Sequence, residues 1–142
     1  MIQSRREEYP MLHQIEIPCW ITKPFILKHS ELTFIYSTDA TYSNRTWGQA
    51  KEAMGLFNTI PCPTKFRDPC DKESAFFADS KMFLIEALWD KVFKTAKSFD
   101  KPIICFPNMG TGGAELPTRA PQCYALLKDF ITKYQHPLIK WL

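Results

Sequence analysis

The sequence predicts an α/β fold with a mixed or mostly parallel sheet flanked by helices. Short apolar runs at residues 32–37 (LTFIYS) and 103–106 (IICF) alternate with segments of helical character, and this alternation is typical of strand–helix–strand units. The 142 residues are the usual length of one domain. We find no internal repeat or linker, so a single domain is expected over residues 1–142, with the polar residues 1–13 only partly ordered.

The first third of the chain predicts two or three short strands. Ile15 and Ile17 lie on one face of the alternating segment HQIEIPCWI, which indicates a strand that Pro18 ends or confines to a sheet edge. Residues 25–27 (FIL) are a candidate edge strand. Residues 32–37 have the continuous apolar character of a buried strand.

The middle of the chain predicts a helix and an irregular segment. A polar loop leads from the second strand into a helix over residues 49–54, where Gly55 is a plausible C-cap. Pro61 and Pro63 exclude a central strand at residues 58–64 but permit a short edge strand. Residues 66–74 are expected to form a loop.

Two further helices frame the last strand. The first runs over residues 78–99, with Asp79 or Ser80 as its cap. Its expected buried face is Phe83, Leu84, Ala87, Leu88, Val92 and Phe93. Residues 100–102 (DKP) end it, and residues 103–106 then form a strand buried on both faces. A last helix is predicted over residues 117–134, whereas the tail HPLIKWL has no assignment.

The composition excludes several classes of protein. Hydrophobic residues make up 45% and charged residues 23%, as in an ordinary globular domain. The net charge of +3 is not concentrated in a basic patch, so a nucleic-acid partner is not expected. The five cysteines form no CxxC pair, and the histidine spacing does not fit a zinc site. We therefore predict reduced thiols, no metal and no cofactor. No apolar stretch suggests a membrane span or secretion, so a cytoplasmic location is expected.

The clearest chemical signal is the glycine-rich loop CFPNMGTGGAELP at residues 105–117, which holds three of the five glycines. It follows a strand and precedes a helix, as does the loop at residues 37–49, and ligands of open α/β sheets bind at such strand ends. Helix N-termini attract phosphate. Gly110, Gly112 and Gly113 lack a Cβ, can adopt positive φ and can approach a phosphate closely, and Thr111 adds a hydroxyl. Because the spacing matches neither common nucleotide fingerprint, a purely structural turn remains the alternative.

Other residues of these two loops are candidate ligand contacts, namely Asn44, Arg45, Gly48, Gln49 and Asn108, and so is Lys65 on the proline-containing loop after Pro63 and Thr64. Arg45 offers a fork of donors and Lys65 a compact positive charge, both suited to phosphate, although either could be a solvated surface residue. Gln49 could face the ligand or only begin its helix, and Asn108 could only shape the turn by adopting a left-handed conformation.

The strand and loop ICFPNMGTG resemble the phosphate loop of macrodomains, where an apolar strand leads to a Gly-Thr-Gly turn around the distal phosphate and ribose of ADP-ribose. More closely, the chain resembles small phage and prophage proteins of macrodomain-like type. The resemblance covers residues 32–130 and is carried by IYSTDATYSNRTWGQA, IPCPTK, FFADSKMFLIEALWDKVF and NMGTGGAELPTRAP.

The resemblance implies a macrodomain-like domain that binds ADP-ribose or a related nucleotide. It would then be a phage anti-defence factor in the host cytoplasm that sequesters or hydrolyses a nucleotide signal. Asp39 is the best acid–base candidate for hydrolysis, since neither loop contains histidine, but it could also cap its loop. Trp47 departs from the family pattern, in which a small residue stands there, and it could stack on a base.

A function of another class is the alternative. A protein-interaction module, such as a phage inhibitor of a host or defence protein, would use the glycine loop only as structure. It would expose an aromatic patch, including Trp20, Trp47 or Trp141, and would have no concave polar pocket.

Overall fold

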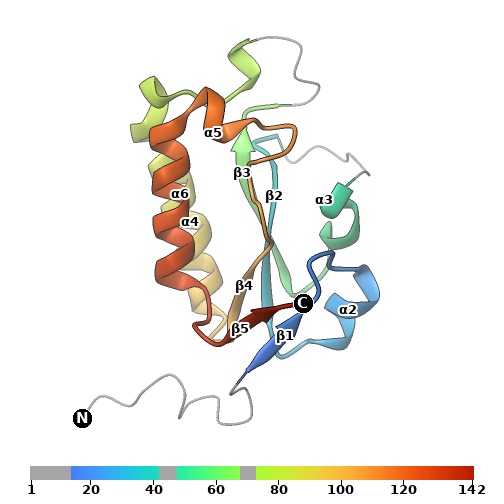
Figure 1. Cartoon of the computed structure of the whole chain (residues 1–142). Helices are drawn as coiled ribbons and strands as arrows, with labels where there is room; N and C mark the ends of the chain where they lie inside the picture. Colours follow the sequence, from blue (N-terminus) through green and yellow to red (C-terminus); the bar gives the residue numbers. More distant parts are fainter. Residues whose placement is uncertain (1–13, 42–47, 68–72) are drawn as a thin grey trace, which may run out of the picture.

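Three parallel strands form the central sheet of the computed structural model, which describes residues 14–41, 48–67 and 73–142 (Figure 1). Strand β2 (Thr33–Asp39) lies between β3 (Thr59–Lys65) and β4 (Ile103–Cys105). Because all three strands are parallel, their carboxyl ends meet at one edge of the sheet. The α/β class with a mostly parallel sheet is thus confirmed. Residues 1–13, expected to be only partly ordered, lie outside the described ranges.

The helices cover both faces of this sheet. Helix α3 (Gly48–Ala53) joins β2 to β3 and packs on β2, whereas α4 (Met82–Ser98) joins β3 to β4 and packs on β3 and on α6 (Pro121–Tyr134). Figure 1 shows α2 and α3 on one side of the sheet and α4 and α6 on the other. The chain therefore leaves β2 toward one face and β4 toward the opposite face, which makes the space between these two strand ends the topological switch point.

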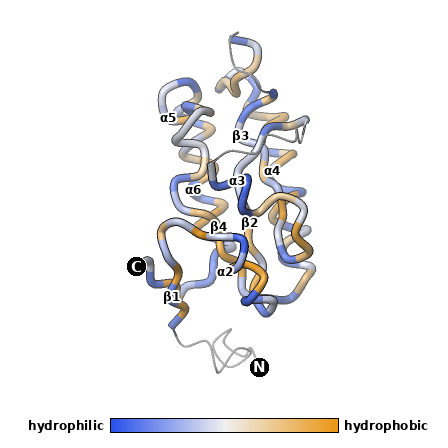
Figure 2. Tube along the Cα trace, turned by 90° about the vertical axis from the view of Figure 1, so that its right-hand side faces the viewer, coloured by the Kyte–Doolittle hydropathy of each residue, from blue (hydrophilic) through white to orange (hydrophobic). Residues whose placement is uncertain are grey.

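The core lies between the sheet and its helices. Phe34 and Ile35 of β2 and Trp89 and Phe93 of α4 have no exposed surface, and burying a side chain of this size contributes about 1.5–3 kcal/mol. The Trp89 ring nitrogen donates a hydrogen bond of 2.6 Å to the carbonyl of Pro63. Hydrophilic and hydrophobic positions alternate along the flanking helices (Figure 2), as expected for helices with one buried face. No helix within the described ranges has the length and apolar character needed to span a bilayer.

Strand β3 lies at the edge of the sheet and contains both Pro61 and Pro63. The edge position is the one that the prolines allow, because a proline cannot donate a hydrogen bond to a neighbouring strand. The strand is longer and more regular than the sequence indicated, with seven residues. Its regularity comes from pairing along most of its length with β2.

A second, two-stranded parallel sheet joins β1 (Ile15–Ile17) to β5 (Ile139–Trp141). Strand β1 was expected, and it ends immediately before Pro18. Strand β5 comes from the tail that had no assignment, since three residues become a strand only through their partner. The pairing is extended by a hydrogen bond of 2.9 Å from the Leu142 amide to the Ile17 carbonyl.

Residues 25–27 are helical, so the expected edge strand is wrong there. They lie in α2 (Lys23–Lys28), where the Thr22 side chain accepts a hydrogen bond from the Phe25 amide and Pro24 occupies the first turn. A threonine cap and an early proline are the usual start of a helix, and they outweigh the strand propensity of so short an apolar run.

The long helix differs from its prediction in its start and in its buried face. Helix α4 begins at Met82, after a 3₁₀ turn at η2 (Asp79–Lys81), and Asp79 does not cap it. The Asp79 carboxylate instead accepts hydrogen bonds from the amides of Gln122 and Cys123 at the start of α6. Phe83 is 91% exposed, because the buried face is Ile85, Trp89, Val92, Phe93 and Ala96.

The last helix is interrupted at Ala120, which separates α5 (Leu116–Arg119) from α6. Ala120 has φ −147° and ψ 69°. The following residue is Pro121, whose ring disfavours the α conformation in the residue before it. The predicted single helix over residues 117–134 is therefore corrected to two.

Candidate functional site

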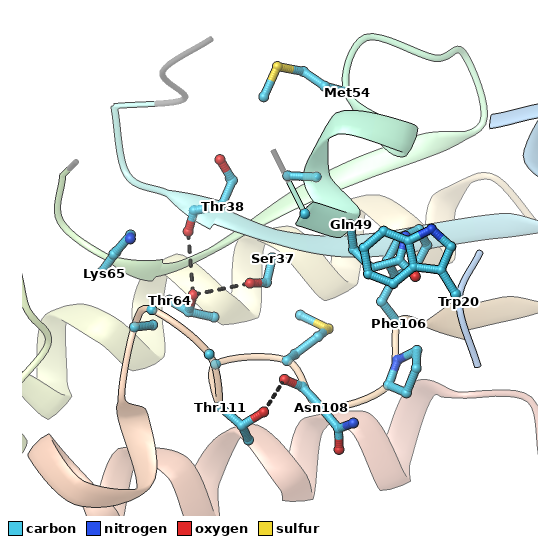
Figure 3. A pocket seen from close by; sticks show the side chains of 18 of the residues that line it. Trp20, Ser37, Thr38, Gln49, Met54, Thr64, Lys65, Phe106, Asn108 and Thr111 are labelled. Carbon is cyan, nitrogen blue, oxygen red and sulfur yellow. Dashed lines mark hydrogen bonds between the residues drawn. The ribbon is translucent and has the colours of Figure 1, made fainter. Parts of the chain in front are cut away.

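A cleft of about 400 Å³ opens at the carboxyl edge of the central sheet (Figure 3). It lies at the switch point, between the strand ends from which the chain leaves toward opposite faces. Its lining combines the ends of β2 and β3, the start of α3, the segment after β1 and the glycine loop. The lining residues are Cys19, Trp20, Ser37, Thr38, Gly48, Gln49, Ala50, Met54, Thr64, Lys65 and residues 106–114.

Local hydrogen bonds and one obligatory glycine fix the glycine loop. The carbonyl of Asn108, which has a left-handed φ of 60°, accepts hydrogen bonds from the amide and the hydroxyl of Thr111 at 3.1 and 2.7 Å. Gly110 has φ 81°, and a Cβ there would lie 2.8 Å from Cδ2 of Leu116. Only glycine fits this position without a shift. Positive φ was expected to be open to all three glycines of the loop, and Gly110 is the one that adopts it.

Gly112 and Gly113 are placed differently, because both have room beside them. A Cβ on Gly112 would meet no protein atom within 4 Å, and one on Gly113 would lie 3.6 Å from Nζ of Lys65. Among the described residues, neither glycine's amide donates a hydrogen bond to a protein acceptor. The cleft therefore has open backbone next to an ammonium group.

Lys65 reaches this position from the end of β3. Its carbonyl accepts a hydrogen bond of 2.9 Å from the Ala40 amide, and it forms an antiparallel bridge with Phe76 on its other side. The next amide, that of Phe66, donates to the Ala75 carbonyl at 2.8 Å. Neighbours on both sides thus hold the backbone that carries the Lys65 ammonium.

The remaining polar lining is neutral. The hydroxyls of Ser37 and Thr64 lie 3.3 Å apart, and the Thr64 hydroxyl is 3.5 Å from the Thr38 carbonyl (Figure 3). Among the described lining residues there is no carboxylate and no imidazole. In the same part of the chain, no cluster of three His, Cys, Asp or Glu side chains could hold a metal ion.

The buried cysteines do not supply a nucleophile. Burial raises the pKa of the Cys62 and Cys105 thiols above the ordinary value, and burial together with the Asp79 carboxylate raises the pKa of Cys123 to about 12. A thiol must ionise to act as a nucleophile. These three cysteines and the exposed Cys19, which lines the cleft, are free thiols.

The part of the chain that forms the cleft matches a protein family. A family of unknown function (DUF7831) matches residues 17–130. The chain belongs to DUF7831. The DUF7831 match contains every residue that lines the cleft, whereas β5 and all of β1 except Ile17 lie outside it. No curated protein and no solved structure matches the chain.

Several predicted site residues of this DUF7831 protein do come together. Eight of them line the cleft: Gly48, Gln49, Lys65, Asn108, Gly110, Thr111, Gly112 and Gly113. Asn44, Arg45 and Trp47 lie outside the described residues. Gln49 begins a helix, as one of its two predicted roles required, but its amide is engaged: Oε1 accepts from the Ile21 amide and Nε2 donates to the Ile21 carbonyl, both at 2.7 Å.

Asp39, the acid–base candidate, does not line the cleft itself, although it follows Thr38 and pairs with Lys65 across the strands. It is 1% exposed, and its Oδ1 accepts hydrogen bonds from the amide of Thr41 at 2.8 Å and from the Thr41 hydroxyl. This is the arrangement of an aspartate that shapes its own turn, which was the alternative role for Asp39.

Trp20 is the main lining residue that the sequence reasoning did not place in the site. Its side chain is 54% exposed, although tryptophan is usually well buried. It lies between β1 and α2. The available signal was its position three residues after a predicted strand, in a loop of the kind that carries sites.

Proposed function

We propose that the cleft binds ADP-ribose or a related nucleotide and so sequesters it. The observation that supports this most directly is the Lys65 ammonium against Gly113, within a glycine loop at the switch point of a parallel sheet. This is where α/β folds bind nucleotides.

The chemistry of this end of the cleft suits a phosphate. The Lys65 ammonium and the backbone amides of Gly112 and Gly113 are hydrogen-bond donors, and hydrogen bonds to ionised groups are stronger than neutral ones. Gly112 and Gly113 leave space for phosphate oxygens to approach the backbone. The hydroxyls of Ser37 and Thr64 could then face a sugar, which also carries hydroxyls.

The cleft is also of the right size and polarity. Its volume of about 400 Å³ falls in the usual range of small-molecule sites, roughly 300–1,000 Å³. The protein-interaction alternative predicted an exposed aromatic patch without a concave polar pocket. The presence of the cleft favours the nucleotide over that alternative.

Binding fits the lining better than hydrolysis. Hydrolysis requires a positioned base or an activated water, and the described lining offers hydroxyls, amides and one ammonium but no carboxylate. We extend the proposal to a phage factor that removes a nucleotide signal in the host cytoplasm, which rests on the resemblance to phage macrodomain-like proteins.

Isothermal titration with ADP-ribose, cyclic ADP-ribose and NAD tests the proposal. We expect binding of at least one of them, weakened about 10-fold or more in Lys65→Gln, since hydrogen bonds to charged groups contribute about 1.5–3 kcal/mol. Lys97→Gln, at an exposed position of α4, is the matched control and should bind as the wild type does. Absence of binding below millimolar concentration would refute the proposal, and chromatography of the titrated ligand would reveal any hydrolysis.

A further inference from the structure

Trp20 and Lys65 lie on opposite sides of the cleft. Figure 3 shows the Trp20 indole on the side that α3 borders and the Lys65 ammonium on the other, with the ends of β2 and β3 between them. One end of the cleft therefore offers a flat aromatic ring, and the other offers a cation and open backbone.

The backbone after Trp20 is fixed by side chains of α3. Gln49 makes two hydrogen bonds of 2.7 Å to the amide and carbonyl of Ile21, whose side chain is completely buried. Glu52 accepts a third hydrogen bond, of 2.9 Å, from the Lys23 amide. Trp20 is half exposed to solvent, but the backbone that follows it is held by hydrogen bonds at Ile21 and at Lys23.

An exposed tryptophan on an anchored backbone is preorganised for stacking. A ring that is already in place loses little conformational freedom when a ligand binds. Every nucleobase has a flat face, and stacking on an aromatic side chain strengthens binding by roughly 10- to 100-fold per base.

We propose that Trp20 is the platform on which the base of the bound nucleotide stacks, and that Gln49 is a positioning residue that holds this platform. This inference rests on the proposed function, because it names the residue that contacts the base of the same ligand whose phosphate Lys65 contacts. It names a nucleobase, rather than a sugar phosphate alone, as part of what the cleft recognises.

The test compares ADP-ribose with ribose 5-phosphate, which keeps a sugar and a phosphate but has no base. Trp20→Ala should weaken ADP-ribose binding about 10- to 100-fold and change ribose 5-phosphate binding less than about 2-fold. Trp20→Phe, which keeps a flat ring, should retain most of the affinity. Because Trp20 is half exposed, both variants should fold, which circular dichroism can verify.

Fluorescence gives a second readout. ADP-ribose should quench tryptophan emission in the wild type, and Trp20→Phe should lose that change while still binding. For Gln49→Ala we expect a partial loss of ADP-ribose affinity, with ribose 5-phosphate unaffected. The double variant Trp20→Ala/Gln49→Ala should bind no more weakly than Trp20→Ala, since Gln49 acts through the ring.

The outcomes separate this inference from the proposed function. If the wild type binds ADP-ribose and Trp20→Ala binds it equally well, the platform is wrong and the proposed function stands. Equal losses for both ligands would also overturn the platform, because Trp20 would then support the cleft as a whole. If the wild type binds neither ligand, both proposals fail.

Discussion

The guanidinium carbon of Arg119 lies 3.5 Å from the centroid of the Phe76 ring. Its Nη1 also contacts both carboxylate oxygens of Glu73 at 2.9 Å. Arg119 ends the short helix that follows the glycine loop, whereas Phe76 pairs with Lys65. One side chain therefore joins the segment that carries the cation of the cleft to the segment that carries its glycines.

Replacing Arg119 by methionine should destabilise the protein by about 1–3 kcal/mol, measured by urea denaturation. The loss comes mainly from the ring contact, which contributes about 0.5–2 kcal/mol. The ion pair contributes less, because the Glu73 side chain is 90% exposed. Glu73→Gln should accordingly cost less than about 1 kcal/mol. A cost for Glu73→Gln equal to that for Arg119→Met would contradict this division.

A side chain added at Gly110 should mainly lower stability, whereas one added at Gly112 should mainly prevent binding. Gly110→Ala should lower the free energy of unfolding by about 1–3 kcal/mol, since it combines a positive φ with a contact of 2.8 Å. Gly112→Val meets open space and should change stability by less than about 1 kcal/mol, yet it should abolish nucleotide binding. Thermal shift and titration on the same samples measure both. A folded Gly112→Val protein with unchanged affinity would rule out the phosphate loop.

Asp39 should behave as a turn-forming residue. Asp39→Ala removes the acceptor for both Thr41 hydrogen bonds and should cost about 1–2 kcal/mol. Asp39→Asn keeps an acceptor oxygen and should cost less. If the protein also hydrolyses its ligand, turnover by Asp39→Asn decides the second role. Loss of turnover with unchanged stability and binding would make Asp39 catalytic.

Stability should fall as the pH rises above about 8.5, the ordinary pKa of a thiol. Burial raises the pKa of Cys62 and Cys105 in the folded protein, so these thiols ionise first in the unfolded chain. Their contribution is fully present below that pH and is lost above it, at up to about 1.4 kcal/mol per pH unit for each thiol. Denaturation curves between pH 7 and 10 measure the slope. Cys62→Ala should make the slope shallower, and an unchanged slope would contradict the assignment.

Local sequence signals predicted the central elements well. The strands β2 and β4 overlap the apolar runs at residues 32–36 and 103–106, and Gly55 and the Asp100–Pro102 segment mark helix ends through their own backbone preferences. The errors lie where distant residues decide. Asp79 caps a helix more than 40 residues further along the chain, and Trp89, on the buried face of α4, donates to the carbonyl of Pro63 in another element.

The candidate site was predicted to a similar extent. The glycine loop follows a strand that the sequence identifies, so its place at the carboxyl edge of a parallel sheet could be foreseen. Lys65 was expected on a proline-containing loop, whereas it is the last residue of β3. Trp20 could not be placed in the same way, because the preceding strand β1 belongs to another sheet, in which it pairs with β5. Gln49 was recognised as polar and well placed, but its engagement with Ile21 depends on how the segment between β1 and α2 lies against α3.

The pairing of β1 with β5 has a consequence for the order of folding. It brings together segments as far apart as Cys19 and Leu142, whose hydrogen bond spans 123 residues, and closing so long a loop is entropically costly before the intervening chain is compact. We therefore expect β1 and β5 to join last and to exchange their amide hydrogens sooner than β2 does. Trp20, which follows β1 and lines the cleft, would thus be the last residue of the site to reach its place on folding and the first to leave it on unfolding.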